Sequence, residues 1–76
     1  MKETNYYVYR TRIDGRIDDE WLEKVTTDKE EAIQLAQSIA YCIARDNQSK
    51  MYGVEIRVFS TPEDEENQWN WDNIEF

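Results

Sequence analysis

The 76-residue sequence contains no histidine, one cysteine, one proline and two glycines. Without histidine, the chain cannot supply an imidazole base, a histidine-containing triad or an imidazole metal ligand. A single cysteine cannot form a disulfide within the chain, which is typical of proteins in a reducing compartment. The sequence also has no glycine-rich phosphate-binding loop. We therefore expect no enzymatic activity, no cofactor and no bound metal.

Long apolar runs are also missing. No run approaches the roughly 20 residues that a membrane span needs, and residues 1–5 do not lead into the apolar segment of a signal peptide. The ten aromatic residues nevertheless indicate a folded chain, because disordered chains are poor in aromatic side chains. We expect a single domain over residues 1–76, with an acidic, aromatic C-terminal extension from about residue 60.

The charge balance is strongly acidic, with 17 acidic and nine basic residues and a net charge of −8. Residues 17–31 carry a net charge of −5, and residues 58–76 carry six acidic residues and no basic ones. Negative charge repels phosphate backbones and anionic lipids, so we expect no direct binding to nucleic acid or membrane. The expected electrostatic partner is a basic protein surface.

Residues 5–13 predict a first strand, because they are rich in aromatic and β-branched side chains. Side chains alternate between the two faces of a strand, and one of the two rows contains Arg10 and Arg12. We therefore expect the other row to face the core. That row consists of Tyr7, Tyr9, Thr11 and Ile13.

A hairpin should follow this strand, because Asp14-Gly15 is a turn signal. We expect the second strand at about residues 21–25, with Trp21 and Val25 facing inward. The run Asp18-Asp19-Glu20 between the turn and that strand should then form a solvated loop or a bulge.

Residues 28–44 predict an amphipathic helix that begins with a capping box, formed by Thr27 and Glu30 or by Asp28 and Glu31. The helix should end near Asp46-Asn47, where asparagine tolerates the left-handed conformation. Its apolar arc consists of Ala32, Leu35, Ala36, Ile39, Ala40 and Ile43, with Ile33 and Cys42 at the edges. Cys42 is therefore expected to be a small buried hydrophobe rather than a nucleophile.

Residues 51–59 alternate in polarity and predict a third strand, with Val54, Ile56 and Val58 pointing inward and Glu55 and Arg57 outward. Thr61-Pro62 has the form of a helix start, although we expect at most a short turn there. The tail, with Trp69, Trp71, Ile74 and Phe76, should add a fourth strand or a lid over the sheet. The predicted fold is α+β. It is a small antiparallel sheet of three to four strands with one helix on one face, in the order β-β-α-β plus the extension.

Two acidic runs are candidates for binding a partner. They consist of Asp18, Asp19 and Glu20, and of Glu63, Asp64, Glu65 and Glu66. In an extended segment, carboxylates two residues apart lie about 6.6 Å apart, close to the spacing of successive phosphates on a nucleic-acid strand. Arginines that grip phosphate also bind carboxylate in bidentate geometry. The alternative is that both runs are solvated faces that keep the protein soluble.

Three aromatic residues are further candidates. Tyr41 lies on the polar side of the predicted helix, and Trp69 and Trp71 lie beside the acidic run of the tail. Tyrosine and tryptophan are enriched at binding hot spots. The alternative for the two tryptophans is that the tail folds back and one of them fills the core.

In size, acidity and lack of catalytic groups, the whole chain resembles the small phage-encoded anti-defence inhibitors, which include anti-CRISPR proteins and other DNA mimics. The resemblance implies a non-catalytic inhibitor in the host-cell cytoplasm. Such an inhibitor blocks the nucleic-acid channel or protospacer-adjacent-motif reader of a CRISPR effector or another nucleic-acid-binding protein. The alternative is an intracellular adaptor or accessory subunit that docks through exposed aromatics. A homodimer joined through an exposed sheet edge is a third interpretation.

Overall fold

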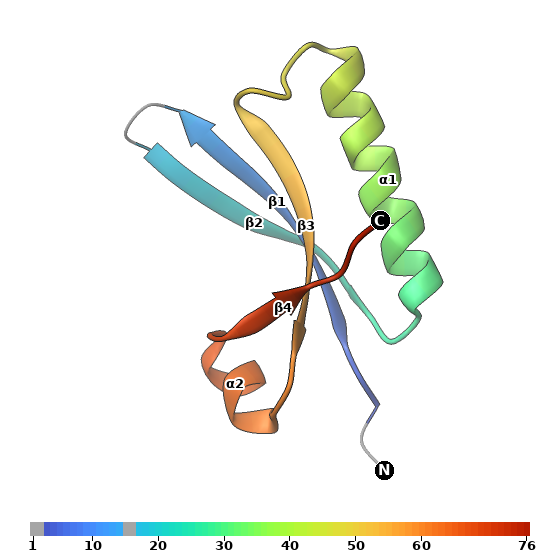
Figure 1. Cartoon of the computed structure of the whole chain (residues 1–76), viewed down its shortest axis with the longest axis vertical. Coiled ribbons are helices and arrows are strands. Elements are labelled where there is room, and N and C mark those ends of the chain that lie inside the picture. The colour runs from blue at the N-terminus through green and yellow to red at the C-terminus, as the bar shows by residue number, and fades with distance from the viewer. Residues whose placement is uncertain (1–2, 15–16) are drawn as a thin grey trace.

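A computed structural model of the chain describes residues 3–14 and 17–76. The elements, in chain order, are β1 (Tyr6–Asp14), β2 (Ile17–Thr26), α1 (Lys29–Arg45), β3 (Tyr52–Phe59), α2 (Pro62–Asn67) and β4 (Trp71–Asn73). All strands pair antiparallel in the order β2-β1-β3-β4, and α1 lies against one face of the sheet (Figure 1). The predicted α+β class and antiparallel sheet are confirmed. The predicted turn falls on Gly15, outside the described residues.

Helix α1 begins and ends where its sequence predicts. Asp28 is the N-cap, and its Oδ1 accepts hydrogen bonds from the backbone N–H groups of Glu30 (3.0 Å) and Glu31 (3.4 Å). The N-cap is therefore that of the second predicted alternative, but Glu31 does not complete the capping box. The N–H of Asp28 donates instead to Oγ1 of Thr26 (3.1 Å), and Glu31 pairs with Lys24. At the other end, Asn47 adopts a left-handed φ of 57°, as expected for an asparagine just beyond a helix.

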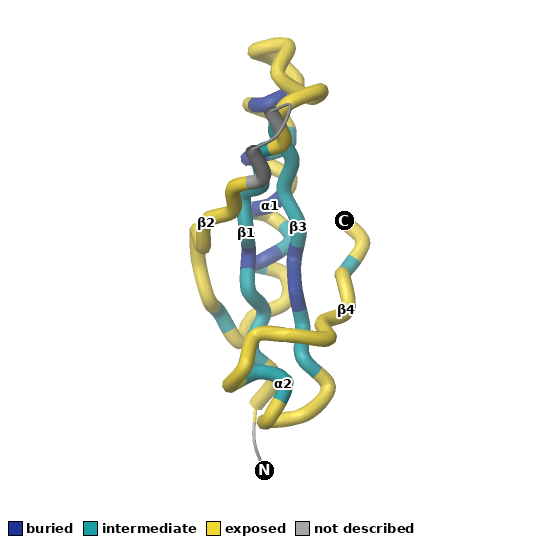
Figure 2. Tube along the Cα trace, turned by 90° about the vertical axis from the view of Figure 1, so that its left-hand side faces the viewer, coloured by how far each residue is buried: buried dark blue, intermediate teal, exposed yellow. Residues whose placement is uncertain are grey.

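The core lies between α1 and the two central strands, where the buried segments of β1, β3 and α1 face one another (Figure 2). Its buried members are Val8, Ala32, Ala36, Ile39, Ile43 and Ile56. Cys42 is exposed, so the prediction that it is buried is wrong. The buried stripe of α1 is narrower than its apolar arc, because only two strands supply buried partners for it.

The predicted inward row of β1 is also wrong. Val8 is the direct partner of Ile56 and is fully buried, so its row faces α1, together with Arg10 and Arg12. Both arginines can stay on this face because their long side chains reach partners at its margin. Arg10 lies 3.5 Å from Glu23, and the guanidinium of Arg12 lies over the ring of Tyr52, 6.0 Å from its centre.

Strand β2 is longer than its sequence predicts. Asp18-Asp19-Glu20 belongs to it instead of forming a loop, because its residues pair with the second half of β1. The register shifts between Val8 and Tyr9, whose partners are Lys24 and Leu22. Glu23 is thus the extra residue of a β-bulge. Trp21 and Val25 are both exposed and lie on opposite faces, so their predicted inward orientation is wrong.

Strand β3 and the tail follow the prediction more closely. Val54 and Ile56 face α1, and the residues from Pro62 onward form a six-residue helix, longer than the expected turn. Thr61 caps this helix by accepting a hydrogen bond from the N–H of Asp64 (3.1 Å). The tail then supplies the predicted fourth strand, and the N–H of Ile74 donates to the carbonyl of Ile56 at 2.9 Å.

We call the face of the sheet away from α1 the second face. Side chains from the three longer strands lie on it, and α2 lies over the end where β1 begins and β3 ends (Figure 1). Its side chains include Tyr7, Tyr9 and Thr11 from β1, Glu20, Leu22 and Val25 from β2, and Glu55, Arg57 and Phe59 from β3.

The packing predicts very different effects for two neighbouring substitutions in α1. Ile39→Ala removes a core side chain and should lower the free energy of unfolding by about 2–5 kcal/mol, whereas the exposed Gln37→Ala should change it by less than about 0.5 kcal/mol. Urea unfolding followed by circular dichroism measures both. Equal losses from the two variants would show that the buried face of α1 is assigned incorrectly.

Candidate functional site

The most unusual side chain of the second face is Arg57, which is only 3% exposed. Its position in β3 agrees with the predicted alternation, because it points away from α1. Contrary to the solvent exposure expected for an outward-pointing arginine, neighbouring side chains cover it. Arginine is almost never fully buried unless it is paired, so the partners of Arg57 define the site.

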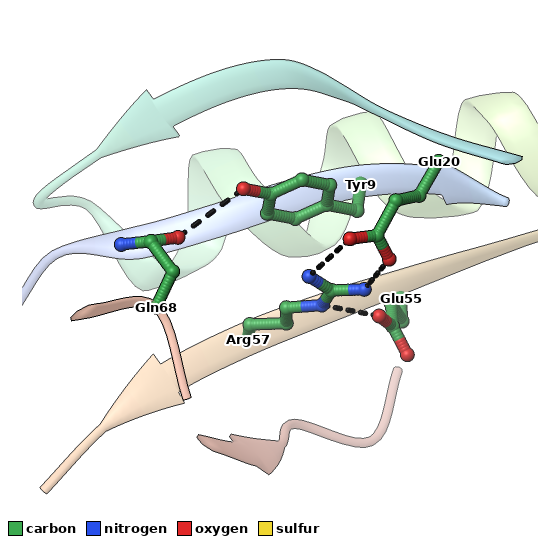
Figure 3. Close-up of polar contacts among 5 residues, drawn as sticks. All are labelled: Tyr9, Glu20, Glu55, Arg57 and Gln68. Carbon is green, nitrogen blue, oxygen red and sulfur yellow. Dashed lines mark hydrogen bonds and ion pairs between the residues drawn. The ribbon is translucent and has the colours of Figure 1, made fainter. Parts of the chain in front are cut away.

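Two carboxylates pair with the guanidinium of Arg57 (Figure 3). Glu20 accepts hydrogen bonds from both terminal nitrogens, one of them at 3.3 Å, in the bidentate arrangement that suits a planar guanidinium. Glu55 accepts a third hydrogen bond, from Nε. Two carboxylates around one guanidinium leave the cluster with a net charge of −1.

These contacts shift the pKa values of both partners. Hydrogen bonds from Arg57 are the main reason that the pKa of Glu20 lies below its ordinary value, and burial opposes them. Burial alone would lower the pKa of Arg57, but the hydrogen bonds to Glu20 and Glu55 outweigh it and raise the pKa. The ion pair is therefore fully charged at neutral pH.

Two aromatic rings enclose the guanidinium from either side. Its central carbon lies 4.0 Å from the ring centre of Tyr9 and 4.0 Å from that of Trp71, well within the range of cation–π attraction. Trp71 also packs edge-on against Phe59, with ring centres 6.3 Å apart, and Phe59 packs in the same way against Tyr7 at 5.3 Å. Rings from β1, β3 and β4 thus form a continuous cluster around Arg57.

The segment after α2 closes this cluster at one end. The hydroxyl of Tyr9 donates a hydrogen bond to Oε1 of Gln68 at 3.2 Å (Figure 3), and Gln68 adopts a left-handed φ of 56°. Burial and the nearby charge of Glu65 raise the pKa of Tyr7. The hydrogen bond from Tyr9 to Gln68, the C-cap of α2, therefore fixes the end of this acidic helix over the second face.

The predicted site residues are distributed over three parts of the molecule. Glu20 and Trp71 meet at Arg57 and are largely occupied by it. In α2, Glu63 and Glu66 are exposed while Asp64 and Glu65 are half-buried, and Trp69 follows them with half of its surface exposed. Asp19 is exposed on β2, and the side chain of Asp18 lies outside the described residues.

Tyr41 is separate from these residues. It is 67% exposed and lies on α1, on the other side of the sheet. Tyr9, Glu55 and Arg57 were not among the predicted site residues. Glu55 and Arg57 share a face of one strand, which is a local signal, but Glu20 lies 37 positions away in the chain.

The described basic residues are unequally divided between the two faces of the sheet. Among the described residues, Arg57 is the only cation whose side chain lies on the second face. Arg10 and Arg12 alternate with Val8 and share its face, and Lys24 is the β2 partner of Val8. The other described cations, Lys29, Arg45 and Lys50, belong to α1 or to the loop that follows it.

The described residues contain no group of three or more cysteine and carboxylate side chains placed to hold a metal ion, and neither described helix has the length and apolarity to span a bilayer. Comparisons with protein-family models, curated proteins and solved structures found no match.

Because Arg57 is buried and paired, we expect that another positively charged side chain cannot replace it. Arg57→Met should lower the free energy of unfolding by about 2–4 kcal/mol, somewhat less than the loss typical of a broken buried ion pair because Glu20 stays half exposed. Arg57→Lys should recover at most about 1 kcal/mol of that loss, because an ammonium lacks the planar fork that pairs and stacks. Urea unfolding of the three proteins is the measurement. An Arg57→Lys protein as stable as the parent would contradict the arrangement.

Proposed function

We propose that the chain is a non-catalytic protein-binding inhibitor, whose acidic surface occupies a basic, nucleic-acid-binding surface of another protein. The observation that carries the proposal is the charge separation across the sheet. The second face and α2 display carboxylates, while the one described cation on that face is buried and neutralised. A cationic groove approaching from this side meets no exposed described cation that would repel it.

Helix α2 supports the proposal because three of its four carboxylates remain available. In the described part of the chain, no lysine or arginine pairs with Glu63, Asp64 or Glu66. Residues three apart on a helix lie about 5–6 Å apart, so Glu63 and Glu66 present neighbouring charges at a separation comparable to that of successive phosphates. The run is therefore helical, not extended as predicted, and its carboxylates have the helical spacing.

The caps and contacts of α2 hold these charges in place. Thr61 caps its start, and the N–H of Trp69 donates to the carbonyl of Asp64 at 3.2 Å. A preorganised charge array binds a cationic groove with less loss of conformational freedom than a flexible acidic tail. The partner class that best fits this proposal is a CRISPR effector or another nucleic-acid-binding protein, met in the cytoplasm of the host cell.

The adaptor alternative rests on a different observation. Trp69 is 52% exposed beside α2, and a half-exposed indole is a common anchor in protein interfaces. Trp71 contributes less to this alternative, because its ring is engaged by Arg57 and Phe59. Docking through Trp69 would depend only weakly on salt, whereas binding through carboxylates would weaken steeply as salt rises.

Displacement of DNA tests the proposal. The unmodified protein should release fluorescein-labelled target DNA from RNA-guided nucleases or other DNA-binding proteins in a panel, and less effectively at high salt. Glu63→Lys/Glu66→Lys should compete at least about tenfold more weakly, because it places like charges against the groove. Glu30→Lys/Asp46→Lys makes the same change in net charge on and beside α1, and should compete as well as the unmodified protein.

Three results would contradict the proposal. They are a lack of displacement from every protein in the panel, undiminished competition by Glu63→Lys/Glu66→Lys, and competition that does not depend on salt. Salt-independent binding that is lost in Trp69→Ala would favour the adaptor function instead. Circular dichroism of each variant controls for folding.

A further inference from the structure

Strand β2 carries an apolar strip on the second face. Leu22 lies opposite Tyr9, and Val25 lies opposite Tyr7, so both side chains share the face of these tyrosines. In a regular strand, residues three apart point to opposite faces. The bulge at Glu23 brings Leu22 and Val25 to the same side, and bulges commonly redirect side chains next to functional sites.

The strip remains open in the folded chain. Leu22 is 47% exposed and Val25 is 42% exposed, and β2 is an edge strand of the sheet. Helix α2 covers the second face at the β3 side, where it contacts that strand. Two large apolar side chains on one open face mark a place where another molecule can bind and cover them.

The charges of β2 leave the strip free of cations. Lys24 pairs with Glu31 of α1, and Glu23 pairs with Arg10, so both interactions lie toward α1. On the second face, the charged neighbour of the strip along β2 is Glu20, two residues from Leu22 and therefore about 6.6 Å away. The strip is thus apolar with an acidic border.

A hollow of about 540 Å³ adjoins the acidic end of the strip. It is lined by Thr11, Ile13 and Trp71, by the carboxylates Asp19, Glu20 and Glu55, and by Arg12 and Arg57. Three carboxylates therefore face two arginines, one of which, Arg57, is already paired with Glu20 and Glu55. Arg57 uses only Oε1 of Glu55, so the other carboxylate oxygen of Glu55 can accept a further donor. The hollow offers apolar walls for a long side-chain stem and carboxylate oxygen for its head, which is the combination that an arginine or lysine fills.

We propose that the strip and the hollow bind a basic amphipathic helix of the partner protein. Its apolar residues would cover Leu22 and Val25, and one basic side chain would enter the hollow. Charge complementarity determines the sign of this occupant, because the second face has no exposed described cation. A sheet face packs well against a helix, as α1 demonstrates on the opposite side. This inference rests on the proposed function and adds an apolar anchor to it.

Two fluorescein-labelled peptides test the inference. Both contain the same leucine and lysine residues over about four helical turns. One places leucine at helical spacing, and its isomer alternates leucine with lysine, as in a strand. The helical peptide should bind at least about tenfold more tightly than the isomer in fluorescence anisotropy, because only its leucines can cover the strip together.

Protein variants then locate the binding. Leu22→Thr/Val25→Thr places β-branched side chains, which favour a strand, at both positions while making the strip polar. The double substitution should weaken binding of the helical peptide by at least about fivefold at both low and high salt. Tyr41→Thr, a change at an even more exposed position on α1, should have no effect. Circular dichroism and urea unfolding confirm that the variants are folded.

Equal binding of the two peptides would overturn the inference, since it would reveal charge attraction alone. Tighter binding of the alternating peptide would overturn it in favour of strand addition at the β2 edge. An unchanged affinity in Leu22→Thr/Val25→Thr would also overturn it. These results do not depend on Glu63 and Glu66, so failure of the anchor and failure of the acidic inhibitor surface can be distinguished.

Discussion

The structure depends on the burial of one guanidinium. Arg57 contacts Tyr9 of β1, Glu20 of β2, Glu55 of its own strand and Trp71 of β4, so one side chain connects all four strands. The apolar core connects only α1, β1 and β3 through fully buried side chains. In a chain of this size the apolar core alone gives a thin margin of stability. The second cluster around Arg57 therefore adds side-chain contacts that hold the outer strands, beyond their backbone pairing with β1 and β3.

The same burial shapes the surface available to a partner. Because Arg57 is covered and paired, it cannot offset the carboxylates of α2, and the second face keeps a single sign of exposed charge among its described residues. The cluster also weakens the case for Asp18-Asp19-Glu20 as a partner-binding run. Glu20 is paired with Arg57 inside the molecule and therefore contributes less to binding a cationic groove of a partner. The proposed function therefore depends on α2 more than on Asp18-Asp19-Glu20, and the bulge in β2 adds an apolar strip on the same face of the sheet.

Local patterns predicted the elements well. The periodicity and cap of residues 28–45, the alternation around Ile56 and the start at Thr61-Pro62 each depend on side chains close in sequence. The faces of β1 and β2 could not be predicted in this way. Arg10 and Arg12 suggested that their side of β1 faces away from the core. In the structure, Glu23 and Tyr52 hold the two arginines at the margin of the core. The bulge and the cluster at Arg57 join residues from distant strands, and no local pattern of residues 5–13 or 51–59 contains those partners.

The central claim is that the Arg57 cluster makes β4 part of the cooperative fold, and native-state hydrogen exchange tests it most directly. The N–H of Ile74, just after β4, donates to the carbonyl of Ile56, and the N–H of Ile39 lies in the centre of α1. If the cluster holds the tail, both amides exchange only through global unfolding and show the same protection. A protection factor for Ile74 that is about 100-fold or more below that of Ile39 would show that β4 opens separately from the rest of the fold. That result would contradict the account.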